Sequence, residues 1–167
     1  MSEITPPRTA HASVDLACFE LAGQTYAVPI ARVREILMTP RLTPLPDAPA
    51  IIEGLIDLRG TLIPVVDLER LLNRDGAPSS ARNRTVVVEV RGLVVGFRVE
   101  RATQVVAATA DSIETIPALM REAGCAVVGA VVRRKDRPPI LVLELEVLIE
   151  GVLASGKGTP ARSEVAA

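Results

Sequence analysis

The sequence predicts an all-β fold, arranged either as small barrels or as a sandwich. About nine or ten short apolar segments follow one another at roughly even spacing, with Gly, Pro and polar residues between them. In one of them, Leu93–Val99, side chains alternate strictly between two faces, which is typical of a strand with one buried side. Hydrophobic residues make up 49% of the chain, but only three residues are aromatic, so Val, Leu, Ile and Ala must build the core.

The first half of the chain contains two predicted hairpins joined by a proline-rich connection. The paired strands are Asp15–Ala22 with Thr25–Ile30, and Gly54–Gly60 with Thr61–Leu68. The first pair turns at Gly23-Gln24 and the second at Arg59-Gly60. The segment Ile30–Leu37 fits either one face of a helix or a strand. The prolines between residues 40 and 49 predict a surface connection, because proline is excluded from helix interiors and central strands.

Three further features end this half. Pro64 has no amide donor, so its strand is predicted to have a free edge or a bulge at that residue. Leu68–Asn73 can form one or two helical turns. The polar segment Asn73–Asn83, which contains Gly76 and Pro78, is predicted to be a loop and a lobe boundary.

The second half is predicted to contain two more hairpins, a strand between them and a closing helix. The strands are Thr85–Val90 with Leu93–Val99, then Ala102–Thr109, then Cys125–Arg133 with Pro139–Leu145. Arg91-Gly92 forms the turn of the first pair. Asp111–Ile116 is predicted to be a helical turn, because Glu114 completes a capping box with Asp111.

The closing segment supplies core residues. Leu141, Leu143 and Leu145 recur at every second position and are predicted to face one barrel interior. Glu146–Ala154 carries apolar residues at helical spacing and is predicted to be the closing helix.

Both ends of the chain are predicted to be disordered, over residues 1–13 and 155–167. The first 13 residues lack the apolar stretch of a signal peptide, and no apolar run approaches the roughly 20 residues of a membrane span. The sequence therefore predicts a soluble, cytoplasmic protein. The 19 basic and 20 acidic residues nearly cancel, which disfavours nucleic-acid binding because phosphate recognition needs a basic footprint.

No residue pattern supports catalysis, a cofactor or a metal. The chain has one histidine, His11, and two separated cysteines, Cys18 and Cys125, which are predicted to be buried, reduced thiols. The segment Gly151–Thr159 nearly matches the phosphate-binding pattern G-x-x-x-x-G-K-[ST]. However, Gly158 stands where a hydroxyl is needed, and a helix rather than a strand precedes it. The sequence therefore predicts no catalytic residue, no cofactor and no metal site.

Two arginine positions stand out. Arg133–Arg137 is predicted to be the solvated tip of the last hairpin, with a nucleic-acid patch as the alternative. Arg59 lies between Leu58 and Gly60, in a tight turn between two apolar strands. Its forked guanidinium can bind a partner's carboxylate or carbonyls, or it can brace its own turn. The local chemistry supports both roles equally.

The segment from Tyr26 to Leu72 resembles the CheW-type chemotaxis coupling proteins. The resemblance is carried by a V-x-E-I motif, a proline-rich loop ending in P-x-x-I-x-G, an N/D-L-R-G turn and an I-P-V-V-D-L strand. These motifs stand here as Val33–Ile36, Pro49–Gly54, Asp57–Gly60 and Ile63–Leu68. A weaker resemblance extends it to about Asp15–Val152.

The resemblance implies two five-stranded β-barrels similar to SH3 domains, packed side by side, with short helices. The domain would span residues 14–154, with lobe 1 at 14–78 plus the closing segment and lobe 2 at 84–141. It also implies a non-enzymatic adaptor that couples chemoreceptor signalling tips to the regulatory domain of a CheA-type histidine kinase, in a membrane-associated array. One alternative is the same role in a pathway controlling pili or cyclic nucleotides. Another, of a different class, is a small-barrel nucleic-acid-binding module.

The resemblance further implies that Val33, Glu35, Gly54 and Arg59 meet the receptor or shape its groove. An aliphatic groove would receive the apolar face of a helical hairpin, with Glu35 and Arg59 as polar guides at the rim. The alternative interpretation of Val33 is a buried residue of the core.

Two positions depart from the family pattern. Asp57 stands where the family usually has Asn in the turn before Arg59. Glu100-Arg101 stands where the family usually has an acidic residue followed by a small or apolar one. Contacts of the second lobe are therefore expected to differ.

Overall fold

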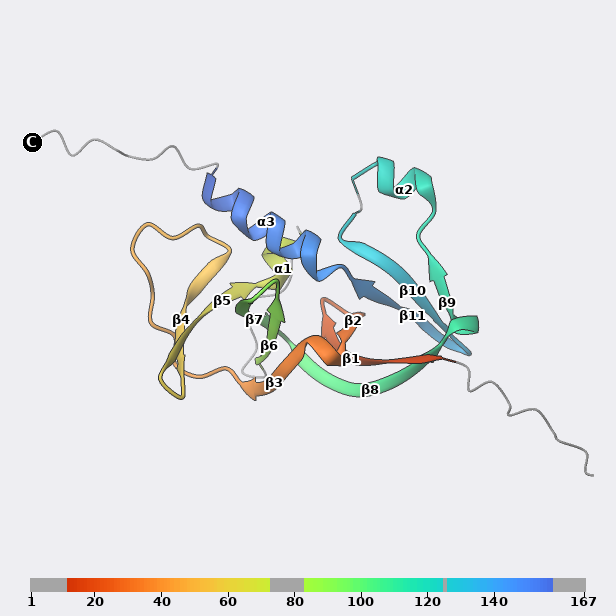
Figure 1. Cartoon of the computed structure of the whole chain (residues 1–167), viewed down its shortest axis with the longest axis horizontal. Helices are drawn as coiled ribbons and strands as arrows, with labels where there is room; N and C mark the ends of the chain where they lie inside the picture. The colour runs from red at the N-terminus through yellow and green to blue at the C-terminus, as the bar shows by residue number, and fades with distance from the viewer. Residues whose placement is uncertain (1–11, 73–82, 125, 158–167) are drawn as a thin grey trace, which may run out of the picture.

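The computed structural model describes residues 12–72, 83–124 and 126–157. Over these residues the chain forms two mixed β-sheets with a few short helices (Figure 1), which confirms the all-β prediction. Lobe A holds the strands β1 (Ser13–Leu21), β2 (Gln24–Pro29), β8 (Arg101–Thr109), β9 (Ile113–Thr115), β10 (Val128–Arg134) and β11 (Arg137–Leu143). Lobe B holds β3 (Val33–Met38), β4 (Ile52–Leu58), β5 (Thr61–Asp67), β6 (Arg84–Val90) and β7 (Leu93–Val99). The helices are η1 (Ile30–Arg32), α1 (Leu68–Leu71), η2 (Ala110–Ser112), α2 (Ala118–Glu122) and α3 (Leu145–Lys157).

The sheets divide the chain differently from the predicted lobes. Lobe A has the strand order β8-β1-β2-β11-β10-β9, six strands rather than five, and lobe B has the order β3-β6-β7-β5-β4. The predicted division at residues 78–84 is therefore wrong, because β6 and β7 join the sheet of β3–β5. Long-range strand pairing determines which strands share a sheet. Strand β1 lies along β8 in an antiparallel ladder, and parallel ladders join β11 to β2 and β5 to β7.

Three hairpins have their turns at an X-Gly pair, as the sequence indicates. The turns are Ala22-Gly23, Arg59-Gly60 and Arg91-Gly92, and both residues of each pair have positive φ. Two successive positive φ values give the twist that matches two paired strands, and glycine adopts the second without strain. The first turn lies one residue before the predicted Gly23-Gln24.

Several elements differ locally from prediction. Ile30–Leu37 combines both alternatives, since η1 takes its first three residues and β3 takes the rest. The helical turn predicted at Asp111–Ile116 is wrong, because only η2 is helical and Ile113 then pairs with Val132 as part of β9. Helix α2 was not predicted, and α3 continues to Lys157, past the predicted end at Ala154.

Pro64 has no backbone N–H to donate, and it lies where β5 has a strand partner on only one side. On one side it is opposite Leu55 of β4. On the other side the ladder from β5 to β7 begins only at Val65, so the strand edge is free at Pro64. This agrees with the predicted free edge.

The buried side chains form three clusters. The interlobe core lies between the two sheets and draws residues from both, with α3 covering it (Figure 1). A second cluster lies inside lobe A and a third inside lobe B. Strand β6 shows how one strand serves two clusters: Val86 and Val88 face the interlobe core, whereas Val87 faces the lobe B cluster. Its almost continuous valine sequence follows from being buried on both faces.

The predicted leucine series divides between two elements. Leu143 ends β11 and Leu145 begins α3, and both belong to the interlobe core rather than to the interior of one lobe. Leu141 is partly buried against the same core.

Cys18 is buried, and burial raises the pKa of its thiol, as expected for an unreactive cysteine. The predictions for residues 1–11, for Cys125, for the 73–82 loop and for the tail from residue 158 lie outside the described residues.

Lobe B also contains a half-buried cluster of charges. Arg98 of β7 forms an ion pair with Glu53 of β4 at 2.5 Å, and it lies 3.8 Å from Asp67. Burial is the largest cause that raises the pKa of the Glu53 carboxyl, and Asp67 raises it further, while Arg98 opposes both. The folded protein therefore holds the Glu53 proton more tightly than the unfolded chain does.

This shift predicts the direction of a pH effect. With a raised pKa in the folded state, the contribution of Glu53 to stability is fully present below the unfolded pKa and is lost as pH rises through the folded pKa. We expect Glu53→Gln to remove this contribution to the pH dependence of the free energy of unfolding, from about pH 4 upward. Urea denaturation across that range measures both proteins, and parallel curves would show that Glu53 has an ordinary pKa.

Candidate functional site

A groove of about 420 Å³ lies on lobe B, between β3 and the β4–β5 hairpin. Its lining combines aliphatic side chains with a polar or charged rim. The aliphatic residues are Leu58, Ile63, Val87 and Val94, and the polar ones are Arg34, Glu35, Arg59 and Thr61. The aliphatic residues belong to, or pack against, the lobe B cluster, so the groove rests on a rigid core.

An ion pair joins the two sides of this groove. Arg59 Nη2 lies 3.0 Å from Glu35 Oε2, although β3 and β4 are at opposite ends of the strand order. The sheet therefore curls enough to bring the β4–β5 turn close to β3, as in a small barrel. The Arg59 side chain is 79% exposed and that of Glu35 is 26% exposed. Glu35 thus anchors the pair, while most of the guanidinium remains open to a partner.

The turn that carries Arg59 is held by another residue. The backbone N–H of Gly60 donates a 2.9 Å hydrogen bond to Oδ1 of Asp57. Arg59 has φ 53° and Gly60 has φ 84°, so the arginine is held in a tight turn at the end of the hairpin. Its ion pair runs to a different strand, which does not support the alternative of a local brace.

The other two predicted residues lie outside the groove lining. Val33 is half-buried and packs against the interlobe core, which matches its alternative as a core residue. Gly54 is buried on β4, where a Cβ atom would come within 2.6 Å of the carbonyl oxygen of Thr43. Thr43 and Leu55 exchange two backbone hydrogen bonds of 2.8 Å, which fasten the proline-rich connection to β4. Gly54 therefore shapes the groove region through the backbone.

The sequence reasoning missed part of the groove. Arg34 lies at its rim and donates two hydrogen bonds to Oε2 of Glu89 on β6. The alternation along β7 could have identified Val94, since it faces the side opposite to Val95 and Phe97. Finding Val87 required the two-faced burial of β6, which no single-strand pattern reveals.

The chain is similar to known proteins in both sequence and structure. A family model described as a CheW-like domain matches residues 15–152. The chain belongs to the CheW family. It is accordingly a scaffold and adaptor protein of the chemotaxis type. The motif-based resemblance to this family is confirmed.

Individual known proteins are similar over about half of the chain or more. The probable chemotaxis protein CheW of Rhizobium etli is 31% identical over 134 residues, which cover 80% of this chain and 86% of that protein. The crystal structure of the scaffolding protein TtCheW from Thermoanaerobacter tengcongensis matches with a TM-score of 0.75 and 29% identity, covering 83% of this chain and 94% of that one. Protein FrzA of Myxococcus xanthus is 37% identical over 79 residues, 47% of this chain and 49% of that protein.

Both departures from the CheW pattern have local explanations. Asp57 keeps an oxygen acceptor for the Gly60 amide, so the turn tolerates it in place of Asn. Glu100 Oε1 accepts a 2.9 Å hydrogen bond from the Ala22 amide, and Arg101 forms an ion pair with Glu20 at 2.5 Å. The pair Glu100-Arg101 therefore fastens the start of β8 to the β1–β2 hairpin.

The described part of the chain does not support a metal site, a phosphate-binding loop or a membrane-spanning helix. It contains no group of three or more His, Cys, Asp or Glu side chains placed to hold a metal ion. Residues Gly151–Lys157 of the phosphate-loop-like segment lie in α3 and form no loop. None of the helices within the described ranges is long and apolar enough to cross a membrane.

Proposed function

We propose that this CheW-family chain couples the signalling tip of a chemoreceptor to the regulatory domain of a CheA-type histidine kinase. It does so without catalysing a reaction, in the cytoplasm, at a membrane-associated receptor array. The observation that carries the proposal is the groove of lobe B with the Glu35–Arg59 pair across it. An aliphatic floor suits the apolar face of a helical hairpin, and rim charges set its register.

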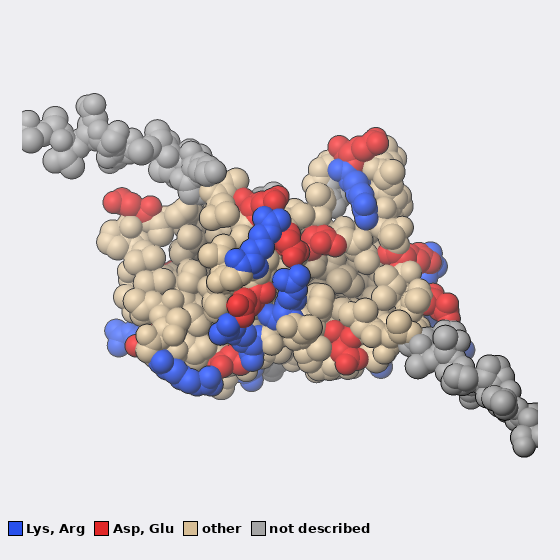
Figure 2. Space-filling view, in the orientation of Figure 1, with Lys and Arg blue, Asp and Glu red and all other residues tan. Residues whose placement is uncertain are grey.

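The four site residues have different parts in this proposal. Arg59 and Glu35 guide the receptor at the groove rim. Gly54 supports the groove through the close approach of Thr43, whereas Val33 packs against the interlobe core and holds the start of β3. The mixed charges on the face shown in Figure 2 also favour a protein partner, because positive and negative side chains are interspersed there.

Substitution of Arg59 distinguishes a role in guiding the receptor from a role in bracing the hairpin turn. An exposed ion pair contributes about 0–1 kcal/mol to stability, so Arg59→Ala should lower the melting temperature by only a few degrees. Binding of a receptor-tip helical hairpin should weaken by about tenfold, while binding of the kinase regulatory domain is retained. Thermal melts and two titrations measure these effects.

Arg91→Ala provides the matched control. Arg91 also occupies an X-Gly hairpin turn of lobe B, is exposed, and is paired with a glutamate of α3 at 3.6 Å. It should leave both titrations unchanged. Equal losses for Arg59→Ala against receptor and kinase, with a large drop in melting temperature, would assign Arg59 a structural role instead.

A further inference from the structure

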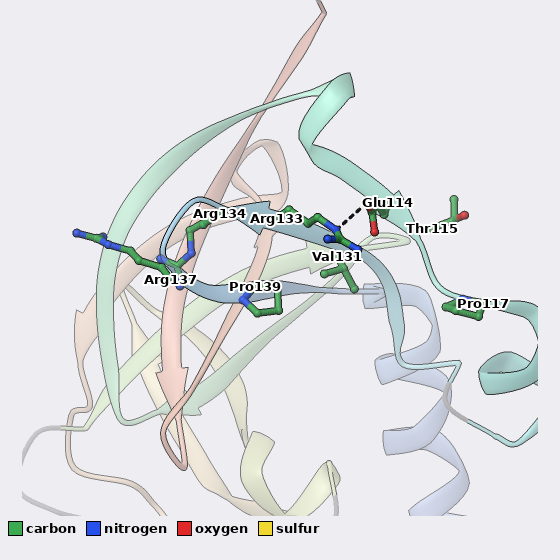
Figure 3. Close-up of a pocket in the computed structure, with 8 residues that line it drawn as sticks. All are labelled: Glu114, Thr115, Pro117, Val131, Arg133, Arg134, Arg137 and Pro139. Atoms are coloured by element: carbon green, nitrogen blue, oxygen red, sulfur yellow. Dashed lines mark ion pairs between the residues drawn. The ribbon is translucent and has the colours of Figure 1, made fainter.

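Lobe A has a second concavity, which the adaptor proposal does not use. It is a cavity of about 460 Å³ between β9 and the tip of the β10–β11 hairpin (Figure 3). We call it the β9–β11 pocket. Apart from Thr115, the lining residues form two groups, one apolar and one charged. The apolar group is Pro117, Val131 and Pro139, and the charged group is Glu114, Arg133, Arg134 and Arg137.

Positive charge is concentrated at this pocket. Three arginines and one glutamate line it, although the whole chain has a net charge of −1. Figure 3 shows Arg133 turned toward Glu114 on the neighbouring strand, and the two side chains form an ion pair of 2.7 Å. One of the three guanidinium groups is thereby neutralised, which leaves two in excess.

The two remaining arginines differ in how they are held. Arg134 donates two hydrogen bonds to the carbonyl oxygen of Pro138, at 3.0 and 2.7 Å, so its guanidinium is fixed across the hairpin tip. Arg137 is exposed, and its side chain forms no ion pair or hydrogen bond with any described residue. Arg134 therefore supplies one oriented cation, and Arg137, whose side chain extends away from Glu114 in Figure 3, supplies one without an internal partner at the edge of the pocket.

We propose that the β9–β11 pocket binds an acidic segment of a partner protein, one that carries two or more carboxylates beside an apolar side chain. Charge complementarity selects the carboxylates, since arginine forks bind them bidentately. The prolines and Val131 provide an apolar contact of side-chain size. A nucleic acid or an anionic membrane would require an extended basic surface, and the near-neutral chain does not supply a long-range field of that kind. This site lies on a different sheet from the groove at Arg59, so it is independent of the proposed receptor contact.

An NMR titration of the full chain tests the proposal. The probe is the blocked pentapeptide Glu-Glu-Leu-Glu-Glu, added to 15N-labelled protein at low salt, with Gln-Gln-Leu-Gln-Gln as the neutral comparison. We expect saturable shifts confined to amides of β9 and the β10–β11 tip, for the acidic peptide only. Raising the salt from about 0.05 to 0.3 M should weaken binding severalfold, because the charges are exposed.

Variants locate the binding. Arg137→Glu should weaken it by at least about tenfold, since it replaces attraction with like-charge repulsion. It should leave the remaining spectrum unchanged, because Arg137 has no internal partner. Arg133→Gln should weaken binding less. Arg91→Glu, the same charge change at a hairpin turn of lobe B, should stay within about twofold of the parent.

Three outcomes would overturn the proposal. One is the absence of saturable shifts at the pocket, and another is equal weakening by Arg91→Glu, which would show that only net charge matters. The third is binding of a single-stranded oligonucleotide or of phosphatidylserine vesicles at the pocket more tightly than the peptide. A defect of Arg137→Glu in peptide binding with normal receptor-tip binding would support two separate sites.

Discussion

Replacing Gly54 with Val is expected to lower the free energy of unfolding by about 3–5 kcal/mol. Gly54 has φ +155°, which residues with a side chain rarely adopt, and an added Cβ would lie 2.6 Å from the Thr43 carbonyl oxygen and 3.3 Å from the Leu42 Cβ atom. Relief requires moving the backbone at Thr43, which breaks its two hydrogen bonds with Leu55. Leu42 packs against the lobe B cluster, so the damage should reach the groove floor.

The variant Gly92→Ala distinguishes the free-energy cost of a positive φ from the cost of a steric clash. Gly92 has φ +77°, but an added Cβ would meet nothing within 4 Å, so that variant should lose only about 1 kcal/mol. Urea denaturation of both variants gives the difference. If Gly54→Val costs no more than Gly92→Ala, the proline-rich connection can leave β4 freely, and Gly54 has no role in supporting the groove.

Local sequence patterns predicted most strands, because each hairpin carries its own signals. Alternation along β7 and the X-Gly pairs of the turns depend only on neighbouring residues, and they fixed three hairpins to within a residue or two. Sheet membership depends on long-range pairing. The β1–β8 ladder joins residues about 80–100 positions apart, and no local pattern identifies such partners. The predicted lobe boundaries failed for that reason.

The sequence predicted the candidate site only where family motifs identified its residues. The family motifs selected Glu35 and Arg59, and the structure brings the two into contact. The motifs also selected Gly54, whose role in the fold depends on Thr43, a residue in an irregular loop whose position no periodicity predicts. Val87 of the aliphatic floor was missed because it lies in a strand buried on both faces, where alternation gives no signal. The β9–β11 pocket was missed because β9 was predicted to be helical.

Replacing Leu143 with Ala is the second large expected effect, a loss of about 2–5 kcal/mol in the free energy of unfolding. Leu143 is only 3% exposed and belongs to the interlobe core, together with Leu145 and Leu148 of α3. Truncation would remove apolar contacts and leave a cavity between two sheets, where close packing allows little collapse. Urea denaturation followed by far-UV circular dichroism measures the loss.

The shape of that transition is as informative as its midpoint. Because the interlobe core takes side chains from both sheets, the lobes should unfold together, and Leu143→Ala should shift one cooperative transition to lower urea. Leu62→Ala is the matched control, since Leu62 is 64% exposed on β5 and should cost less than about 0.5 kcal/mol. A loss below that value for Leu143→Ala would contradict its burial in the core. Two separated transitions would show that each lobe is stabilised by its own cluster, and that the interlobe core contributes little to holding them together.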